Sequence, residues 1–85
     1  MKWCVYILKC FDESLYTGIT NNLNKRIADH NKGRGAKYTR SRRPVVLMAS
    51  FEAENRSQAS KEEHRIKQLS RKQKLELIWK STESK

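Results

Sequence analysis

The 85-residue sequence is poor in acidic residues, and no part of it forms a long hydrophobic run. Nine Asp and Glu residues stand against nineteen Lys and Arg residues, which gives a formal net charge of +10. Because the basic excess recurs along the chain, we expect a broadly positive surface and consider nucleic acid as the first partner. Basic faces that serve only solubility are the alternative.

No stretch approaches the ~20 apolar residues of a membrane span, and MKWCVYILKC at the start is too short for a signal peptide. We therefore expect a cytoplasmic protein without a membrane partner. The two cysteines, Cys4 and Cys10, fall in one predicted strand, too far apart along it for a disulfide, and they lack the spacing of a zinc site. We interpret both as packing residues.

The chain also lacks internal repeats and low-complexity segments, and its length allows one domain. We expect that domain at residues 1–80 and a frayed tail at residues 81–85. The sequence leaves the oligomeric state open and is compatible with a monomer.

Two apolar runs at residues 3–10 and 15–20 flank the turn-prone FDES and predict a β-hairpin. A helix is then expected from a cap at Thr20 or Asn21 to Asn31. Its inner side would carry the apolar i, i+4 pair Leu23 and Ile27.

Gly33 is expected to end that helix, and residues 32–44 lack an apolar period, so we predict a long loop there. A third strand is expected at residues 45–51 and a second helix at residues 56–69. SRKQ at residues 70–73 matches a capping box and predicts a further helix.

On this last helix, Leu75, Ile78 and Trp79 would lie on one side. The order β-β-α-β-α-α predicts an α+β fold, in which a three-stranded, mainly antiparallel sheet is flanked by about three helices.

Several polar residues are candidates for a site. Tyr6 and Tyr16 would share a face of the hairpin if the connecting loop has an odd number of residues. Arg26 and His30 are i, i+4 on the first helix and point the same way, beside its apolar strip. The alternatives are ordinary amphipathic strand tyrosines and a solvent-exposed basic helix edge.

Glu63 is the most informative of these residues, because it falls within the inward stripe of Ala59, Ile66 and Ser70 on the second helix. A carboxylate there needs a cation, a metal or hydrogen-bond donors. A salt bridge, for instance to Arg26, is the simpler interpretation. We expect His64 off this stripe, at the surface.

The predicted loop resembles a phosphate-gripping surface, in which glycines let backbone amides approach a ligand closely. It does not have the glycine spacing of a Walker-type loop. Its candidate nucleic-acid-binding side chains are Lys37, Tyr38, Arg40, Arg42 and Arg43.

CVY, which ends at Tyr6, and YTG at residues 16–18 resemble the paired signatures of the GIY-YIG nuclease superfamily. The resemblance continues in order through TNNLNKRIADHN, GRGAKYTR and SQASKEEHRIKQLSRKQKLELI, and so covers nearly the whole chain. Within this superfamily, the sequence most resembles the small stand-alone bacterial branch. That branch is related to the nuclease domain of the excision-repair incision subunit and to homing endonucleases. Cys4, Val5 and Thr17 depart from the signature residues.

This resemblance implies a metal-dependent endonuclease that hydrolyses DNA phosphodiester bonds in repair or processing. The implied catalytic residues are Tyr6, Tyr16, Arg26, His30 and Glu63. Glu63 would hold one Mg²⁺ or Mn²⁺, and Arg26 would grip the scissile phosphate. Gly18 would allow the strand to approach the substrate closely.

The general base is left open among Tyr6, Tyr16 and His30. Two other functions are also open: a non-catalytic DNA- or RNA-binding protein that uses the same basic surface, and a protein-interaction adaptor.

Overall fold

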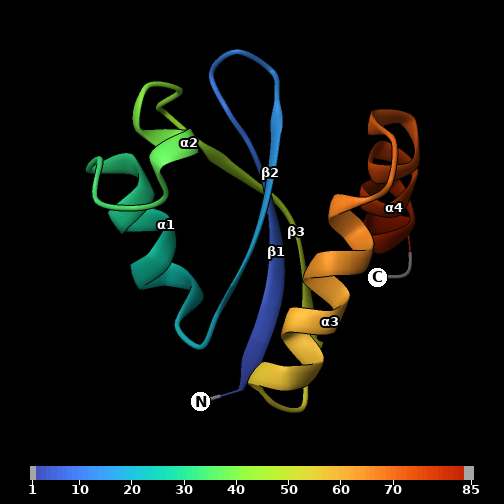
Figure 1. Ribbon diagram of the computed structural model, residues 1–85. Coiled ribbons are helices and arrows are strands. Elements are labelled where there is room, and N and C mark those ends of the chain that lie inside the picture. The colour runs from blue at the N-terminus through green and yellow to red at the C-terminus, as the bar shows by residue number, and fades with distance from the viewer. Residues whose placement is uncertain (1, 84–85) are drawn as a thin grey trace.

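A computed structural model describes residues 2–83 and contains one three-stranded antiparallel sheet (Figure 1). Its strands are β1 (Trp3–Lys9), β2 (Leu15–Thr20) and β3 (Val46–Ala53), and their order in the sheet is β2-β1-β3. The α+β class and the β-β-α-β-α-α order are confirmed, with one additional short helix. The first hairpin therefore makes up the centre and one edge of the sheet.

The register of this hairpin confirms that the two signature tyrosines share a face. Tyr6 pairs with Gly18, and Leu8 pairs with Tyr16, so residues of equal parity lie opposite each other. The connection at residues 10–14 has the odd length that this pairing requires.

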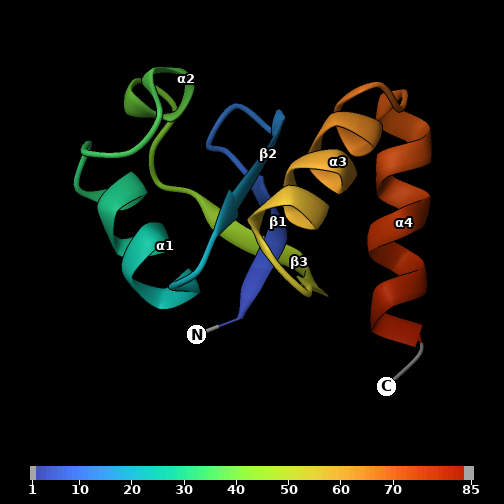
Figure 2. The same ribbon diagram turned by 60° about the horizontal axis from the view of Figure 1, so that its bottom comes forward.

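Each face of the sheet is covered by helices, which gives three layers (Figure 2). On the face with Tyr6 and Leu8 lies α1 (Leu23–Asn31), which packs Leu23 and Ile27 there. On the opposite face lie α3 (Arg56–Lys67) and α4 (Arg71–Glu83). The core on that face contains Val5, Ile7, Ala49, Ala59, Ile66 and Ile78.

The start of α1 differs from the expected cap. Asn22 is the N-cap, and its side-chain oxygen accepts a hydrogen bond from the backbone N–H of Lys25 at 3.3 Å. Thr20 instead belongs to β2, and its hydroxyl accepts a bond from the Asn22 backbone N–H. Gly33 follows the helix with φ +81°, the left-handed conformation that glycine adopts without strain, so its predicted role is confirmed.

The predicted loop of residues 32–44 contains a short helix, α2 (Lys37–Arg40), which the sequence analysis missed. One turn of helix is too short to produce an apolar period, so the pattern could not reveal it. Thr39 of this turn is fully buried, and α2 lies beside α1. The segment therefore belongs to the packed structure.

The capping box at the start of α4 is confirmed. The backbone N–H of Ser70 donates to the Gln73 side chain at 2.9 Å, and the backbone N–H of Gln73 donates to the Ser70 hydroxyl at 3.2 Å. The predicted apolar side of α4 is wrong in part: Ile78 is buried, but Leu75 is 43% exposed and Trp79 is 65% exposed. The residue that joins Ile78 at the core is Leu77, because α4 meets the sheet only through a narrow strip.

The expected frayed tail lies partly outside the described residues. α4 continues to Glu83, and residues 84–85 are not described. Within residues 2–83, no helix is long and apolar enough to cross a membrane. Cys4 and Cys10 are free thiols, and Cys10 packs in the core with Tyr6 and Leu8.

Candidate active site

The candidate site is built around Tyr6, which the central strand β1 carries into the layer between the sheet and α1. The tyrosine is 1% exposed, and its hydroxyl oxygen lies 2.9 Å from His30 Nε2. His30, near the end of α1, is fully buried. The simpler expectations, a surface phenol and an exposed basic edge, do not describe these two residues.

A chain of hydrogen bonds fixes the proton positions on His30. The Thr39 hydroxyl lies 2.9 Å from the backbone carbonyl of Ala36 and must donate to it, because a carbonyl only accepts. His30 Nδ1, 2.8 Å from the same hydroxyl oxygen, therefore donates its proton to Thr39. This leaves Nε2 unprotonated, so the Tyr6 hydroxyl donates to it.

Two glycines let the rings pack this closely. A Cβ on Gly18 would lie 2.5 Å from the hydroxyl oxygen and 2.7 Å from Cζ of Tyr6. A Cβ on Gly35 would overlap Nδ1 of His30. The space that a side chain would fill at Gly18 is thus taken by the Tyr6 ring.

The electrostatics favour a neutral pair. Burial lowers the pKa of His30, and the positive charge of Arg26 lowers it further. Burial also raises the pKa of Tyr6, although a hydrogen-bonding interaction with Arg26 partly opposes this. At neutral pH the histidine is therefore an acceptor and the phenol a donor.

Arg26 lies on α1 one turn before His30 and is partly buried beside the Tyr6 hydroxyl. Its interaction with that hydroxyl raises the pKa of the guanidinium, so Arg26 is a permanent cation at the site. The site thus combines a neutral donor–acceptor pair with a fixed positive charge.

Tyr16 of β2 completes an aromatic cluster. Its ring centroid lies 6.4 Å from that of Tyr6 and 5.3 Å from that of His30. On its other side Tyr16 stacks on Tyr38 at 6.0 Å, and the guanidinium of Arg42 lies 4.0 Å above the Tyr38 ring. The stack holds Tyr16 between His30 and the α2 segment.

Glu63 approaches from α3, on the opposite face of the sheet, beside the edge strand β2. Its side chain is 22% exposed and forms an ion pair with Lys67, with Nζ to Oε2 at 3.4 Å. The carboxylate contributes to raising the pKa of Tyr6, so it lies within electrostatic range of the phenol. The salt bridge expected for Glu63 is thus present, and its cation is Lys67 of the same helix, whereas Arg26 had been given as an example.

The inward stripe on α3 is confirmed for Ala59 and Ile66, which are buried, and His64 is exposed as expected. Ser70 is exposed because α3 ends at Lys67 and Ser70 caps the next helix. Among residues 2–83, no group of three or more His, Cys, Asp or Glu side chains could together hold a metal ion.

The model of the GIY-YIG catalytic domain matches residues 2–83, almost the entire chain. The chain belongs to the GIY-YIG catalytic domain family. The predicted family membership is therefore confirmed.

Several proteins similar to this GIY-YIG domain carry the name UPF0213. UPF0213 protein CPE1444 of Clostridium perfringens is 62% identical over 74 residues, which are 87% of this chain and 80% of the relative. UPF0213 protein SH2523 of Staphylococcus haemolyticus is 54% identical over 77 residues, covering 91% and 94% of the two chains. The solution NMR structure of UPF0213 protein BH0048 from Bacillus halodurans is 44% identical with a TM-score of 0.59, covering 92% of this chain and 83% of the other.

In the basic segment at residues 37–43, which was expected to bind nucleic acid, some side chains are exposed and others are hydrogen-bonded within the protein. Lys37 and Arg40 on α2 are exposed. Arg42 donates to the Asp12 carboxylate at 2.9 Å and to the Tyr38 carbonyl at 2.8 Å. Arg43 donates to the Arg40 carbonyl at 2.9 Å, so both arginines also hold the segment together.

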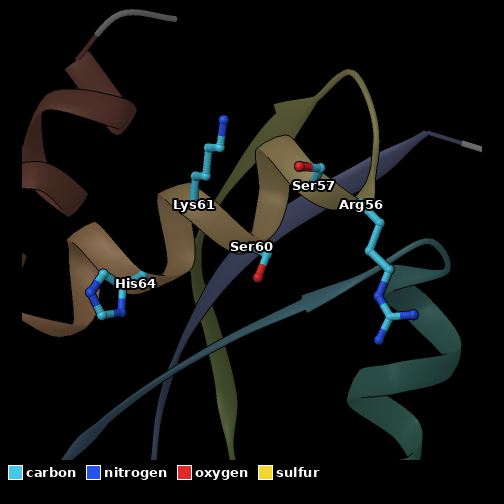
Figure 3. A pocket seen from close by; sticks show the side chains of 5 residues that line it. All are labelled: Arg56, Ser57, Ser60, Lys61 and His64. Carbon is cyan, nitrogen blue, oxygen red and sulfur yellow. The ribbon is translucent and has the colours of Figure 1, made fainter.

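A second basic surface of the GIY-YIG domain lies along the exposed side of α3 (Figure 3). There a shallow pocket of about 680 Å³ is lined by Arg56, Ser57, Ser60, Lys61 and His64. Ser60 is three residues before Glu63 and thus its neighbour on the helix surface. In Figure 3, Arg56 and Lys61 extend in different directions, which spreads positive charge along this side.

Sequence reasoning missed Thr39 and Gly35. Both lie in the segment interpreted as a loop, where their contact with His30 depends on how that segment folds back onto α1. Both lie in GRGAKYTR, one of the stretches that carry the family resemblance, but that stretch does not distinguish a buried hydroxyl from an exposed one.

Proposed function

We propose that this GIY-YIG domain is a divalent-metal-dependent endonuclease that hydrolyses phosphodiester bonds in DNA. The observation that carries the proposal is the buried chain of hydrogen bonds from Tyr6 through His30 to Thr39, beside Arg26. A neutral histidine whose free nitrogen faces a phenol is a prepared proton acceptor.

The hydrogen-bond directions suggest the proton path. A water molecule that attacks phosphorus gives a proton to the Tyr6 oxygen, while the phenolic proton of Tyr6 passes to His30 Nε2. The new oxygen–phosphorus bond forms as the bond to the leaving oxygen breaks. Tyr6 alone is a poor base at pH 7, because its pKa is raised by burial, and the free nitrogen of His30 overcomes this difficulty.

Arg26 is suited to the phosphate. It is a permanent cation next to the Tyr6 hydroxyl, so it would hold the non-bridging oxygens where negative charge develops. Tyr16 lies against His30 and limits water around the pair.

Glu63 offers one hard oxygen ligand, and this donor fits Mg²⁺ or Mn²⁺, which are commonly held by one or two carboxylates together with substrate oxygens and water. When bound, such an ion supplies charge neutralisation at the phosphate. Lys67, which is half exposed, would have to release Glu63 for the ion to bind.

A non-catalytic nucleic-acid-binding function is the second candidate. It is favoured by the ion pair of Glu63 with Lys67 and by the lack of a larger ligand cluster within residues 2–83. Binding through the basic surface would not need either tyrosine hydroxyl.

The test is Mg²⁺- or Mn²⁺-dependent nicking of supercoiled, branched and single-stranded DNA by the purified protein. We expect cleavage by the wild type, and a loss of at least about 10²-fold in Arg26→Ala and Glu63→Ala, with DNA binding retained by Glu63→Ala. If all three proteins bind DNA and none cuts any substrate, the nuclease proposal fails and the binding function replaces it.

A further inference from the structure

A small pocket at the outer edge of β2 is not explained by the chemistry above. Its volume is about 280 Å³, and it lies where the two helical layers meet around the edge of the sheet. The residues that line it are Leu15, Tyr16, Thr17, Tyr38, Lys67 and Lys74. The wall combines two cations with aromatic and aliphatic surface and has no acidic residue.

Thr17 gives an independent sign that this pocket takes a polar ligand. The residue is 3% exposed, and its hydroxyl has no hydrogen-bond partner within the described part of the chain. A buried hydroxyl without a partner is costly, and such a group in a native structure calls for an explanation.

The two lysines are available to an anion. Lys67 is half exposed and pairs with the Glu63 carboxylate. Lys74 is partly buried and has no ion pair with any described side chain. Leu15 and the edge of the Tyr38 ring offer apolar surface, since Tyr16 and Arg42 already cover the faces of that ring.

We propose that this pocket holds one unpaired nucleotide next to the bond that is cut, with its phosphate on Lys67 and Lys74 and its base or sugar against Leu15 and Tyr38. This inference rests on the proposed function and deepens it. The volume lies just below the ~300 Å³ at which pockets for drug-sized ligands begin, so it suits one nucleotide. A nucleotide must leave its base stack to enter, so the preferred substrate has an unpaired strand at the cut.

The test is an NMR titration of the full chain with deoxyadenosine 5′-monophosphate in EDTA, compared with inorganic phosphate and with deoxyadenosine. We expect the nucleotide to shift the amides of residues 15–17, Lys67 and Lys74, and to bind more tightly than either fragment. Lys74→Ala should weaken binding about tenfold. Lys72→Ala, which removes an exposed charge from the same helix outside the pocket, should leave it unchanged.

Thr17→Val replaces the hydroxyl with a methyl group of similar size. It should leave the free energy of unfolding unchanged or raised, because an unpaired buried hydroxyl is lost, while nucleotide binding weakens. If inorganic phosphate binds as tightly as the nucleotide, or if Lys72→Ala weakens binding as much as Lys74→Ala, the nucleotide pocket is refuted. The titration does not require cleavage, so the two proposals can fail separately. A wild-type protein that binds the nucleotide but never cuts DNA would refute only the nuclease proposal. A wild-type protein that cuts DNA but does not bind the nucleotide in this titration would refute only the pocket.

Discussion

Thr39 determines which ring nitrogen of His30 carries the proton. Its hydroxyl donates to the Ala36 carbonyl, so its oxygen can only accept from His30 Nδ1, and the bare Nε2 is thereby directed at Tyr6. The Thr39 hydroxyl does not contact Tyr6, but it fixes which nitrogen of His30 can take a proton.

Thr39→Val should release this constraint. The change leaves the buried Nδ1–H of His30 without an acceptor, which should cost about 1–3 kcal/mol in urea unfolding. ¹⁵N NMR of the imidazole should show the Nδ1–H tautomer losing its dominance, and Thr39→Ser should restore it. A Thr39→Val protein that keeps the Nδ1–H tautomer would contradict the assigned proton positions.

Gly18→Ala should displace the Tyr6 ring, because the new Cβ would lie 2.5 Å from the phenolic oxygen. We expect a loss of about 1–3 kcal/mol of stability from overpacking, together with loss of cleavage. Gly33→Ala is the matched control, since it strains a left-handed residue at a site that contacts Arg43 and not Tyr6. Equal cleavage by Gly18→Ala and Gly33→Ala would rule out this role for Gly18.

At the scale of elements, the edge strand β2 is what unites the site. It carries Tyr16 and Gly18 on the α1 face and Thr17 on the α3 face, so groups from both helical layers meet around it. The apolar pattern predicted β2 with its observed bounds, Leu15–Thr20, because strand alternation and turn residues are local signals.

The signals that failed were those that depend on tertiary contacts. The one-turn helix α2 and the buried Thr39 lie in a stretch without an apolar period. Leu75 and Trp79 matched a helical pattern but are exposed, because the sheet reaches α4 only near Leu77 and Ile78. The partner of Glu63 is a different case, because Lys67 lies four residues further along the same helix and an i, i+4 pair is a local signal.

The capping box of α4 allows a test at this scale. Ser70→Ala removes the acceptor of the Gln73 backbone N–H and should lower the free energy of unfolding by about 1 kcal/mol. Ser60→Ala, within α3, should have no such cost, because alanine favours a helix interior. Chemical denaturation of both proteins measures the difference, and equal stabilities would show that the box does not stabilise the fold.

For the whole molecule, the buried neutral His30 links stability to pH. Its pKa is lowered in the folded state, so the unfolded chain binds more protons as the pH falls below the ordinary histidine value of about 6.5. Stability should be complete above that value and should decrease as the pH falls toward the folded pKa. The lowered carboxylate pKa values of Asp12, Asp29 and Glu62 act at lower pH, in the range where carboxylates titrate.

Urea unfolding between pH 7.5 and 5 measures this effect. The wild type and His64→Gln should both lose stability over this range, whereas His30→Gln should lose much less. A pH dependence that disappears with His64 instead would show that the buried histidine is not the group responsible.

The charge distribution of the molecule agrees with a polyanionic substrate. Positive charge lies on α2, on the exposed side of α3 and in the pocket at β2. Of these regions, α2 contacts the Tyr6–His30 pair through Thr39, and the pocket contacts it through Tyr16. The central claim is that this pair is a proton relay for phosphodiester cleavage.

The most direct measurement is the single-turnover cleavage rate of Tyr6→Phe, with saturating protein, Mg²⁺ and a branched or single-stranded DNA, alongside its DNA affinity. The claim predicts a rate about 10²–10⁴-fold below that of the wild type at unchanged affinity, because only the hydroxyl that donates to His30 is removed. A Tyr6→Phe protein that cuts as fast as the wild type would contradict it.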